Sequence, residues 1–285
     1  MTERILVTGA SGFIASHLIP VLKKRGYEVL AHSHHEGDIA GDRLDLPEVR
    51  HVFHLAARSF VPEAWKDPVP VYRTNVIGTV NVLEFCRSRG ASLTLLSSYV
   101  YGQPKWLPIG EDHPLQAFNP YSHSKILSEE ACLYYRQQFD LSIAIVRAFN
   151  VYGLGQRRDF LIPLLLEQAL DPECGIISVA DLRPKRDHLN VSDLVELLCV
   201  LADRRVAGIY NAGTGISYSV AEIVDMIWAA GVKPKPVKSQ DQSRPAEVLD
   251  VVADITKAKN ELGWIPKVTL PDGIAAMVVS LSNRE

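Results

Sequence analysis

The sequence predicts an α/β protein with a doubly wound parallel sheet and a smaller C-terminal α/β region, and three observations lead to this prediction. In the first half, short apolar and β-branched runs alternate with longer segments of helical period, as in a parallel sheet covered by helices on both faces. A glycine-rich turn separates the first apolar run from the first helical segment. After Asn150 the pattern loosens into helical stretches joined by loops rich in Pro and Gly.

The expected elements follow from these patterns in chain order. Strands are expected at residues 5–8, 28–32, 52–55, 93–97 and 142–147, with residues 43–45 as a candidate sixth strand. The helices between them are expected at residues 13–25, 68–89 and 121–139. Later helices are expected at residues 160–170, 192–203, 220–230, 255–262 and 271–282. We divide the chain into residues 1–150 and 151–285, and expect some segments of the second part to return to the sheet.

The composition describes an ordinary globular protein of 285 residues, of which 47% are apolar, enough to bury a sizeable core. With 30 Lys and Arg against 33 Asp and Glu, no general positive field is available to hold nucleic acid. The longest apolar runs fall short of the roughly 18 residues that cross a bilayer, and no secretory signal pattern precedes the first strand. The cysteines are far apart and form no CxxC pair. We expect a cytoplasmic protein with reduced thiols and no membrane partner.

The glycine-rich turn at residues 9–15 is placed to bind a pyrophosphate between a buried strand and a helix N-terminus. Gly9 permits the tight turn, and Gly12 lets backbone N–H groups approach the phosphates. Ala15 is the small residue where the helix packs on the strand. A structural turn without a ligand is the alternative. The residues of this turn expected to contact a dinucleotide are Gly9, Ser11, Gly12, Phe13 and Ile14.

The end of the second expected strand bears on the choice between NAD and NADP. Enzymes that use NAD usually place an acidic side chain there, on the ribose 2'-hydroxyl, whereas this chain has Ala-His-Ser-His-His at residues 31–35. Ser33 and the histidines are potential donors to a 2'-phosphate, so NADP is favoured over NAD, unless Glu36 or Asp38 folds back. The histidines with Glu36 also suggest a metal site, but we prefer polar residues at the cofactor mouth and expect no metal.

Tyr121 and Lys125 stand four residues apart on an expected helix, so their side chains lie on one face. A nearby ammonium stabilises a phenolate and lowers the tyrosine pKa from about 10, which suits Tyr121 to exchange a proton with an alcohol during hydride transfer to or from nicotinamide. Such pairs are also common surface contacts on long helices. Ser97 and Ser98 end the preceding strand at the carboxyl edge of the sheet, where ligands bind in doubly wound folds.

Together these segments resemble the extended short-chain dehydrogenase/reductase family, specifically its nucleotide-sugar epimerases, dehydratases and 4-keto reductases. The resemblance covers nearly the whole chain. It rests on residues 7–18 (VTGASGFIASHL), 54–57 (HLAA), 74–79 (TNVIGT), 97–102 (SSYVYG), 119–125 (NPYSHSK), 147–153 (RAFNVYG), 185–193 (KRDHLNVSD), 244–248 (RPAEV), 253–259 (ADITKAK) and 262–266 (LGWIP).

The resemblance implies a Rossmann domain that binds NAD or NADP over residues 1–150 and a mainly substrate-binding region over residues 151–285. It implies that Tyr121 is the acid/base and that Lys125 lowers its pKa and holds the nicotinamide ribose. Ser97 would bond the oxygen that becomes a carbonyl, and Asn75 would support the proton path. Further implied cofactor contacts are Ser33, Asp45, Leu46, Leu55, Ala56, Ala57, Asn75 and Ala148. Implied substrate contacts are Ser59, Ser98, Tyr99, Asn150, Arg186 and Arg244.

Arg186 and Arg244 would hold the diphosphate of a GDP- or UDP-linked sugar, since guanidinium groups suit that anion. The alternative for Arg186 is a surface pair with Asp187 or Glu247.

The resemblance also implies chemistry at C4 of the hexose. Family dehydratases place an Asp-Glu pair directly after the catalytic hydroxyl, whereas this chain has Ser98 and Tyr99, so a dehydratase of that kind is disfavoured. An epimerase or a GDP-4-keto-6-deoxy-sugar reductase fits, and a non-catalytic NADP-binding sensor or scaffold is the alternative. Such a sensor is expected to lose Tyr121 or Lys125, and both are present.

Two features concern shape and assembly. The expected helices at residues 68–89 and 121–139 resemble those that form a four-helix dimer interface in the family, so we expect a homodimer. Between residues 45 and 52 there is almost no room for the helix that family members place before the next strand. We expect the sheet face there to be bare or covered by a partner.

Overall fold

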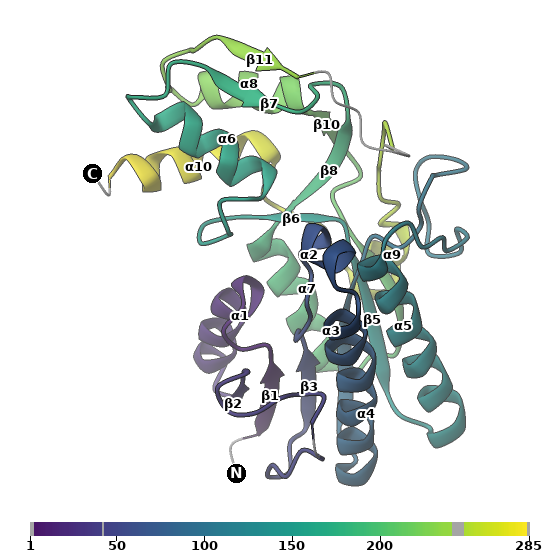
Figure 1. The fold of residues 1–285 in the computed structure, drawn as a ribbon. Helices are drawn as coiled ribbons and strands as arrows, with labels where there is room; N and C mark the ends of the chain where they lie inside the picture. Colours follow the sequence, from purple (N-terminus) through teal and green to yellow (C-terminus); the bar gives the residue numbers. More distant parts are fainter. Residues whose placement is uncertain (1–2, 42, 241–247, 284–285) are drawn as a thin grey trace.

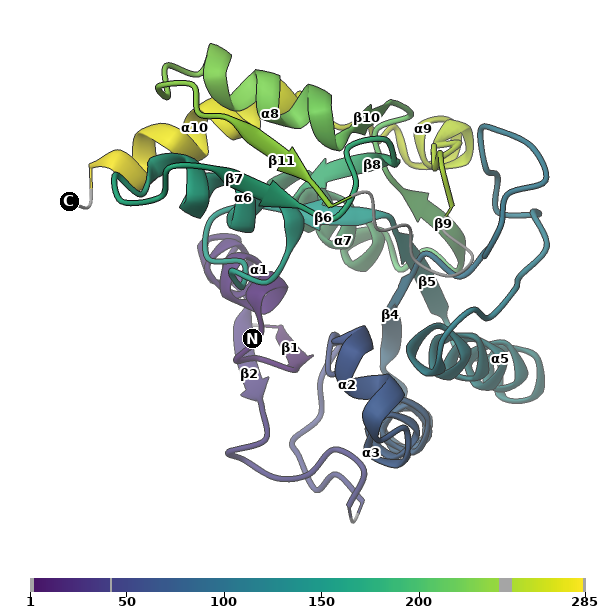
Figure 2. The ribbon, with the colours of Figure 1, turned by 45° about the horizontal axis from the view of Figure 1, so that its top comes forward.

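The computed structural model describes residues 3–41, 43–240 and 248–283. Its main sheet has six parallel strands in the order β2-β1-β3-β4-β5-β9, which confirms the predicted doubly wound α/β fold (Figures 1 and 2). These strands are β1 (Arg4–Thr8), β2 (Glu28–His32), β3 (His51–His54), β4 (Ser92–Ser98), β5 (Ile143–Ala148) and β9 (Gly208–Ala212). The sheet therefore takes one strand, β9, from the second half of the chain.

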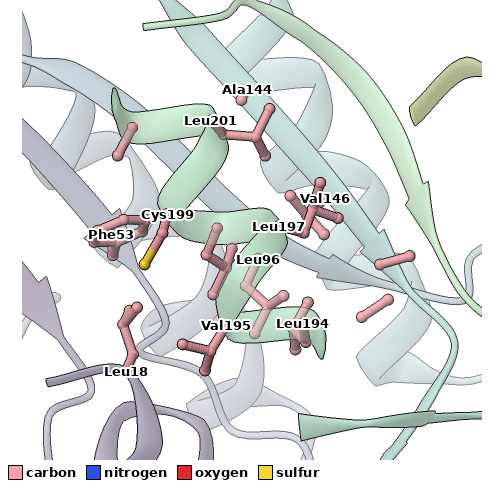
Figure 3. Close-up of a cluster of buried hydrophobic side chains, with 14 of the residues drawn as sticks. Leu18, Phe53, Leu96, Ala144, Val146, Leu194, Val195, Leu197, Cys199 and Leu201 are labelled. Carbon is pink, nitrogen blue, oxygen red and sulfur yellow. The ribbon is translucent and has the colours of Figure 1, made fainter. Parts of the chain in front are cut away.

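Helices cover both faces of this sheet. Successive strand residues point to opposite sides, and both sets of side chains are apolar, so each face needs a covering layer. Ile5 and Val7 of β1 pack with α1 (Phe13–Lys24) and α7 (Val191–Arg204), while Leu6 packs on the other side with α4 (Gly78–Arg89). α5 (Pro120–Phe139) lies beside α4 on that second face (Figure 1). The first core is built on α7, whose leucines, valine and cysteine lie against the sheet and Leu18 of α1 (Figure 3).

The segment between β2 and β3 differs from the prediction. Residues 43–45 form no strand, so the candidate sixth strand was wrong. The chain runs instead as irregular loop to β3, and Ile39 and Val49 are buried in the core beside Leu6 and Val52. Apolar side chains of the loop therefore cover part of the sheet face that the missing helix leaves, and neither a bare face nor a partner is needed there.

The helix expected at residues 68–89 is divided. It consists of α3 (Val69–Tyr72), a π-helical turn η1 (Arg73–Ile77) and α4, and it is preceded by the unexpected short helix α2 (Val61–Lys66). Single π turns inside α-helices occur often at functional sites.

Most of the remaining elements lie beyond the carboxyl ends of β1 and β3 (Figure 1). The strands β6 (Asn150–Tyr152), β8 (Lys185–Asn190) and β10 (Ser217–Ser219) form one small sheet. β7 (Ile177–Val179) and β11 (Val237–Ser239) pair with each other. Around them, α6 (Leu161–Leu170), α8 (Val220–Ala229) and α10 (Leu270–Ser282) enclose a second core, while α9 (Thr256–Leu262) contacts β9. None of the helices described in the structure is long and apolar enough to traverse a bilayer.

Candidate active site

The glycine turn has the geometry that a pyrophosphate requires. Gly9 has φ +67°, and a Cβ there would lie 2.7 Å from the Ala56 backbone nitrogen, so only glycine fits between β1 and the loop after β3. The Gly12 N–H donates to the Gly9 carbonyl at 2.9 Å, and a Cβ on Gly12 would meet only that carbonyl oxygen. Ala15 is buried where α1 packs on the sheet.

The first turn of α1 fits a dinucleotide phosphate. No side chain caps its N-terminus at Gly12, and no acidic residue lies in its first turn, so its N–H groups and dipole are open to an anion. Ser11 is exposed at the turn, and Phe13 and Ile14 are half-buried. Leu55, Ala56 and Ala57 follow β3, and Ala148 ends β5, so all of them lie at the same carboxyl edge of the sheet.

The turn after β2 brings an acidic side chain back to Ser33, which was one of the alternatives that the sequence allowed. The carboxylate of Glu36 folds back onto Ser33, whose N–H and hydroxyl both donate to it. Asp38 does not fold back; it pairs with Arg73 of η1 at 3.3 Å. In the described part of the chain, no group of three or more His, Cys, Asp and Glu side chains is placed to hold a metal ion.

Asp45 does not lie where the family resemblance placed it. Its side chain is fully exposed and is 3.8 Å from Arg89, the last residue of α4, close to where β4 begins. That is the amino end of the strands, opposite the glycine turn. Leu46 packs against the core on this side of the sheet. The expected adenine contacts of Asp45 and Leu46 are therefore corrected, because without a strand at residues 43–45 the loop descends along α4.

Beneath the glycine turn, a buried polar chain ties β1 to the π turn. The Thr79 hydroxyl donates to the Asn75 carbonyl at 2.5 Å, so its oxygen must accept from Nε2 of His54, 3.0 Å away. The Thr8 hydroxyl then donates to Nδ1 of His54 at 2.7 Å. Burial, with a smaller effect of the Lys125 charge, lowers the pKa of His54 to about 3, so the ring is neutral.

Asn75 is buried in η1 and connects three segments. Its side-chain amide donates to the Arg58 carbonyl and to Ser124 Oγ, and its side-chain oxygen accepts the Arg58 N–H at 2.8 Å. Its backbone carbonyl accepts from the hydroxyls of Thr79 and Ser128. The structure thus shows Asn75 as an anchor between the loop after β3 and α5; a part in proton transfer stays a prediction.

Tyr121 and Lys125 project from the first turns of α5, which begins with an Asn119 capping box. The Tyr121 and Ser98 hydroxyls are hydrogen-bonded to each other. Burial raises the pKa of Tyr121, and the hydrogen bond from Ser98 opposes that rise. Lys125 is buried and donates from Nζ to the Leu96 carbonyl at 2.8 Å, and burial lowers its pKa to about 8. The expected lowering of the Tyr121 pKa by Lys125 is therefore not found; Ser98 supplies the lowering contact.

Ser97 faces a buried ion pair. Its hydroxyl donates to Glu129, which lies one helical turn beyond Lys125 on α5. Glu129 in turn accepts from Nε and Nη2 of Arg147 at 3.0 and 2.8 Å, and both side chains are almost completely buried. Arg147 is the register partner of Ser97 in the neighbouring strand β5. Of the two serines, Ser98 contacts Tyr121, and Ser97 contacts the ion pair.

Sequence reasoning did not find Glu129 and Arg147 as members of this site. The signal was present, because residues 121, 125 and 129 share one face of a helix and an arginine ends the next strand. Arg147 also contacts Tyr101, whose hydroxyl bonds Asn211 of β9. The ion pair therefore links the catalytic edge to the last strand of the sheet.

The expected substrate residues are only partly brought together. Asn150 and Arg186 lie on the adjacent strands β6 and β8, and Asn150 donates to the Asp187 carbonyl. Arg186 donates to the carbonyls of Lys185 and Val248, while its charge lowers the pKa of Tyr99, which burial raises. Tyr99 follows Ser98 directly in the sequence. Ser59 is exposed in the loop after β3. Arg244 and Glu247 lie outside the described residues.

Asp187 has a structural role and does not form the surface pair with Arg186 that was the alternative. Its carboxylate is completely buried and accepts the N–H groups of Thr214, Gly215 and Ala253 and the Thr214 hydroxyl. These four bonds join β8 to the loop after β9 and to residue 253. The carboxylate therefore holds this region together beneath Arg186.

Comparison with known proteins agrees with this geometry. The model of the NAD dependent epimerase/dehydratase family matches residues 5–213. The chain is 31% identical to the GDP-6-deoxy-D-mannose reductase of Pseudomonas aeruginosa, covering 100% of this chain and 99% of that protein. It is 30% identical to the UDP-glucose 4-epimerase of Corynebacterium glutamicum, over 93% of this chain and 92% of that protein.

Solved structures give the same result. RMD from Pseudomonas aeruginosa complexed with NADPH superposes with a TM-score of 0.90 at 27% identity, covering 100% of both chains. MoeE5 in complex with UDP-glucose and NAD superposes with a TM-score of 0.89 at 31% identity, covering 99% of both chains. These matches confirm the resemblance that the sequence motifs indicated.

Proposed function

The chain belongs to the NAD-dependent epimerase/dehydratase family, and on this premise we propose that it transfers a hydride at C4 of a nucleotide-diphosphate hexose with Tyr121 as acid and base. It is an NAD(P)-dependent epimerase or reductase of the extended short-chain dehydrogenase/reductase type. The observation that carries the proposal is the hydrogen-bonded pair of Tyr121 and Ser98 hydroxyls at the carboxyl edge of the sheet, one helical turn from the buried ammonium of Lys125.

The nicotinamide supplies the hydride acceptor and donor when it is bound. The protein moves the proton. Tyr121 Oη takes the proton of the C4 hydroxyl when that carbon is oxidised and returns it when the carbonyl is reduced. The Ser98 hydroxyl stabilises the phenolate that forms, since its hydrogen bond lowers the pKa of Tyr121.

Ser97 has the complementary part. Because its proton is donated to Glu129, its oxygen presents only lone pairs and accepts from a sugar hydroxyl. The Glu129 carboxylate, fixed by three bonds from Arg147, keeps that orientation. Asn150 and Arg186, on adjacent strands, support a site for the sugar and its diphosphate.

An assay with a matched panel of nucleotide sugars tests the proposal. The protein is incubated with NAD or NADP, oxidised and reduced, and with GDP- and UDP-linked 4-hydroxy and 4-keto hexoses. Net loss of the reduced-nicotinamide absorbance with a 4-keto sugar identifies a reductase, and interconversion of 4-hydroxy sugars without net cofactor consumption identifies an epimerase. Cofactor binding without either reaction would contradict the proposal and favour the sensor or scaffold.

We also propose that the protein works as a cytoplasmic homodimer through α4 and α5. Support for the dimer comes from exposed apolar side chains on α5 and just before α4, among them Tyr134, Phe139 and Ile77. The free thiols of Cys86, Cys132, Cys174 and Cys199 suit a reducing compartment. A single species of about 32 kDa in light scattering at micromolar concentration would contradict the dimer.

A further inference from the structure

We propose that Glu36 makes this protein select NAD over NADP, by occupying the donors that a 2'-phosphate would need. The inference rests on the proposed function, because it concerns the cofactor of the same site. It reverses the preference for NADP that the non-acidic strand end suggested. The residue is not at the strand end itself but four positions beyond His32, where it is returned to the strand by a turn.

The turn brings Glu36 to the ribose end of the cofactor site. The Ala10 N–H donates to the His32 carbonyl at 3.1 Å, so the end of β2 is held against the glycine turn that faces the pyrophosphate. The next residue, Ser33, begins a turn that the Glu36 N–H closes onto the Ser33 carbonyl at 3.1 Å. In dinucleotide folds the acidic side chain at this strand end holds the ribose 2'-hydroxyl.

In the same turn, the hydrogen-bond donors of Ser33 that a 2'-phosphate would require are already bonded to Glu36. The Ser33 N–H donates to Oε2 of Glu36 at 2.7 Å, and the Ser33 hydroxyl donates to the same oxygen at 2.6 Å. These bonds lower the pKa of Glu36, so the carboxylate stays ionised. A 2'-phosphate would have to displace this carboxylate and then stand beside a like charge.

The second carboxylate oxygen favours the unphosphorylated ribose. Both bonds from Ser33 go to Oε2 of Glu36, so neither of them uses Oε1. A ribose 2'-hydroxyl can therefore donate to Oε1 without breaking the turn. Glu36 thus favours NAD over NADP in two ways: its carboxylate accepts a hydrogen bond from the 2'-hydroxyl of NAD, and its negative charge repels the 2'-phosphate of NADP.

Nearby charges do not cancel this effect. His32 is buried, and its Nε2 has no hydrogen-bond partner among the described atoms; its charge would lower the pKa of Glu36 further. His34 and His35 pack ring to ring, with centroids 3.9 Å apart. Asp38, the other carboxylate of the loop, is paired with Arg73.

Binding measurements on the purified protein test this inference without any sugar. Dissociation constants for NAD and NADP are measured by calorimetry for the wild type, Glu36→Gln and Asp38→Asn. We expect the wild type to bind NAD more tightly. Glu36→Gln should raise NADP affinity relative to NAD affinity about tenfold, since a unit charge a few ångströms away in water changes binding by about that factor. Asp38→Asn, a matched loop carboxylate, should leave the ratio unchanged.

The outcomes separate the two proposals. Tighter NADP binding by the wild type, or an unchanged ratio in Glu36→Gln, would overturn the role of Glu36 and leave the cofactor site intact. Failure of the wild type to bind either dinucleotide would overturn the proposed function as well. The preference should also weaken at high salt, because the charge is exposed, and a salt-independent preference would contradict an electrostatic cause.

Discussion

Replacing Glu129 by Gln is expected to cost about 3–5 kcal/mol of stability, because it leaves the Arg147 guanidinium buried without its counter-charge. The guanidinium makes three bonds to the carboxylate, at 3.3, 3.0 and 2.8 Å, and its side chain is only 4% exposed. Gln keeps the shape but offers a single carbonyl oxygen and no charge. For a chain of this size the loss corresponds to a fall in Tm of about 10 °C.

The measurement is thermal and urea unfolding beside a matched control. Arg158 and Glu167 form an ion pair of nearly the same length, 2.7 Å, but their side chains are 83% and 43% exposed, so Glu167→Gln should cost less than about 1 kcal/mol. The double variant Glu129→Met with Arg147→Met should recover most of the loss, because neither charge is then left unpaired. Equal effects of Glu129→Gln and Glu167→Gln would refute the reasoning.

Three further predictions concern the site itself. Tyr121→Phe should remove nearly all turnover while leaving the dissociation constant of the cofactor close to that of the wild type, and retained activity would exclude Tyr121 as acid/base. Gly9→Ala should lower stability and cofactor affinity by more than Gly90→Ala, measured by unfolding and calorimetry; both have φ near +65°, but only at Gly9 does the Cβ collide with backbone. Because burial lowers the pKa of Lys125 to about 8, turnover that needs its ammonium should fall above about pH 8 in a rate profile. The effect of Lys125 on stability runs the other way from its effect on turnover. Between pH 8 and the unfolded pKa of 10.5 the unfolded chain holds more protons than the folded one, so the free energy of unfolding rises with pH.

The parts of the fold that could be predicted are those where one local pattern decides. The strand β1, the glycine turn and α1 follow each other without a break, and Gly9 shows in the structure the positive φ that its turn position requires. The helices of the second half lie within a residue or so of their expected bounds, since each has an apolar stripe and a clear start or stop.

What the sequence could not provide depends on contacts between distant segments. Residues 43–45 stand where the alternating pattern leaves a place for a strand, but they pair with none, and the loop packs its apolar side chains on the sheet instead. Because that strand was expected, Asp45 was predicted at the carboxyl edge of the sheet, whereas it lies beside Arg89 at the amino edge. The resemblance implied that Ser97 bonds the reacting oxygen and that Ser98 contacts the substrate. Only the placement of Glu129 and Tyr121 shows that Ser97 bonds the ion pair and that Ser98 bonds Tyr121.

The choice of cofactor and the choice between the two reactions bear on each other through Glu36. A reductase takes up a reduced dinucleotide and releases an oxidised one in every turnover, whereas an epimerase returns the hydride to the carbon from which it came and can keep one cofactor bound. A carboxylate that excludes the 2'-phosphate would tie the protein to NAD. Buried hydrogen bonds join β1 to β3, β3 to α4 and η1 to α5 at the edge of the sheet where that cofactor would be held. If Glu36 acts as proposed, an epimerase reaction should run with NAD alone, and a reductase reaction should use NADH in preference to NADPH. A requirement for stoichiometric NADPH would show that the turn at residues 33–36 opens to admit the phosphate, and would favour the reductase.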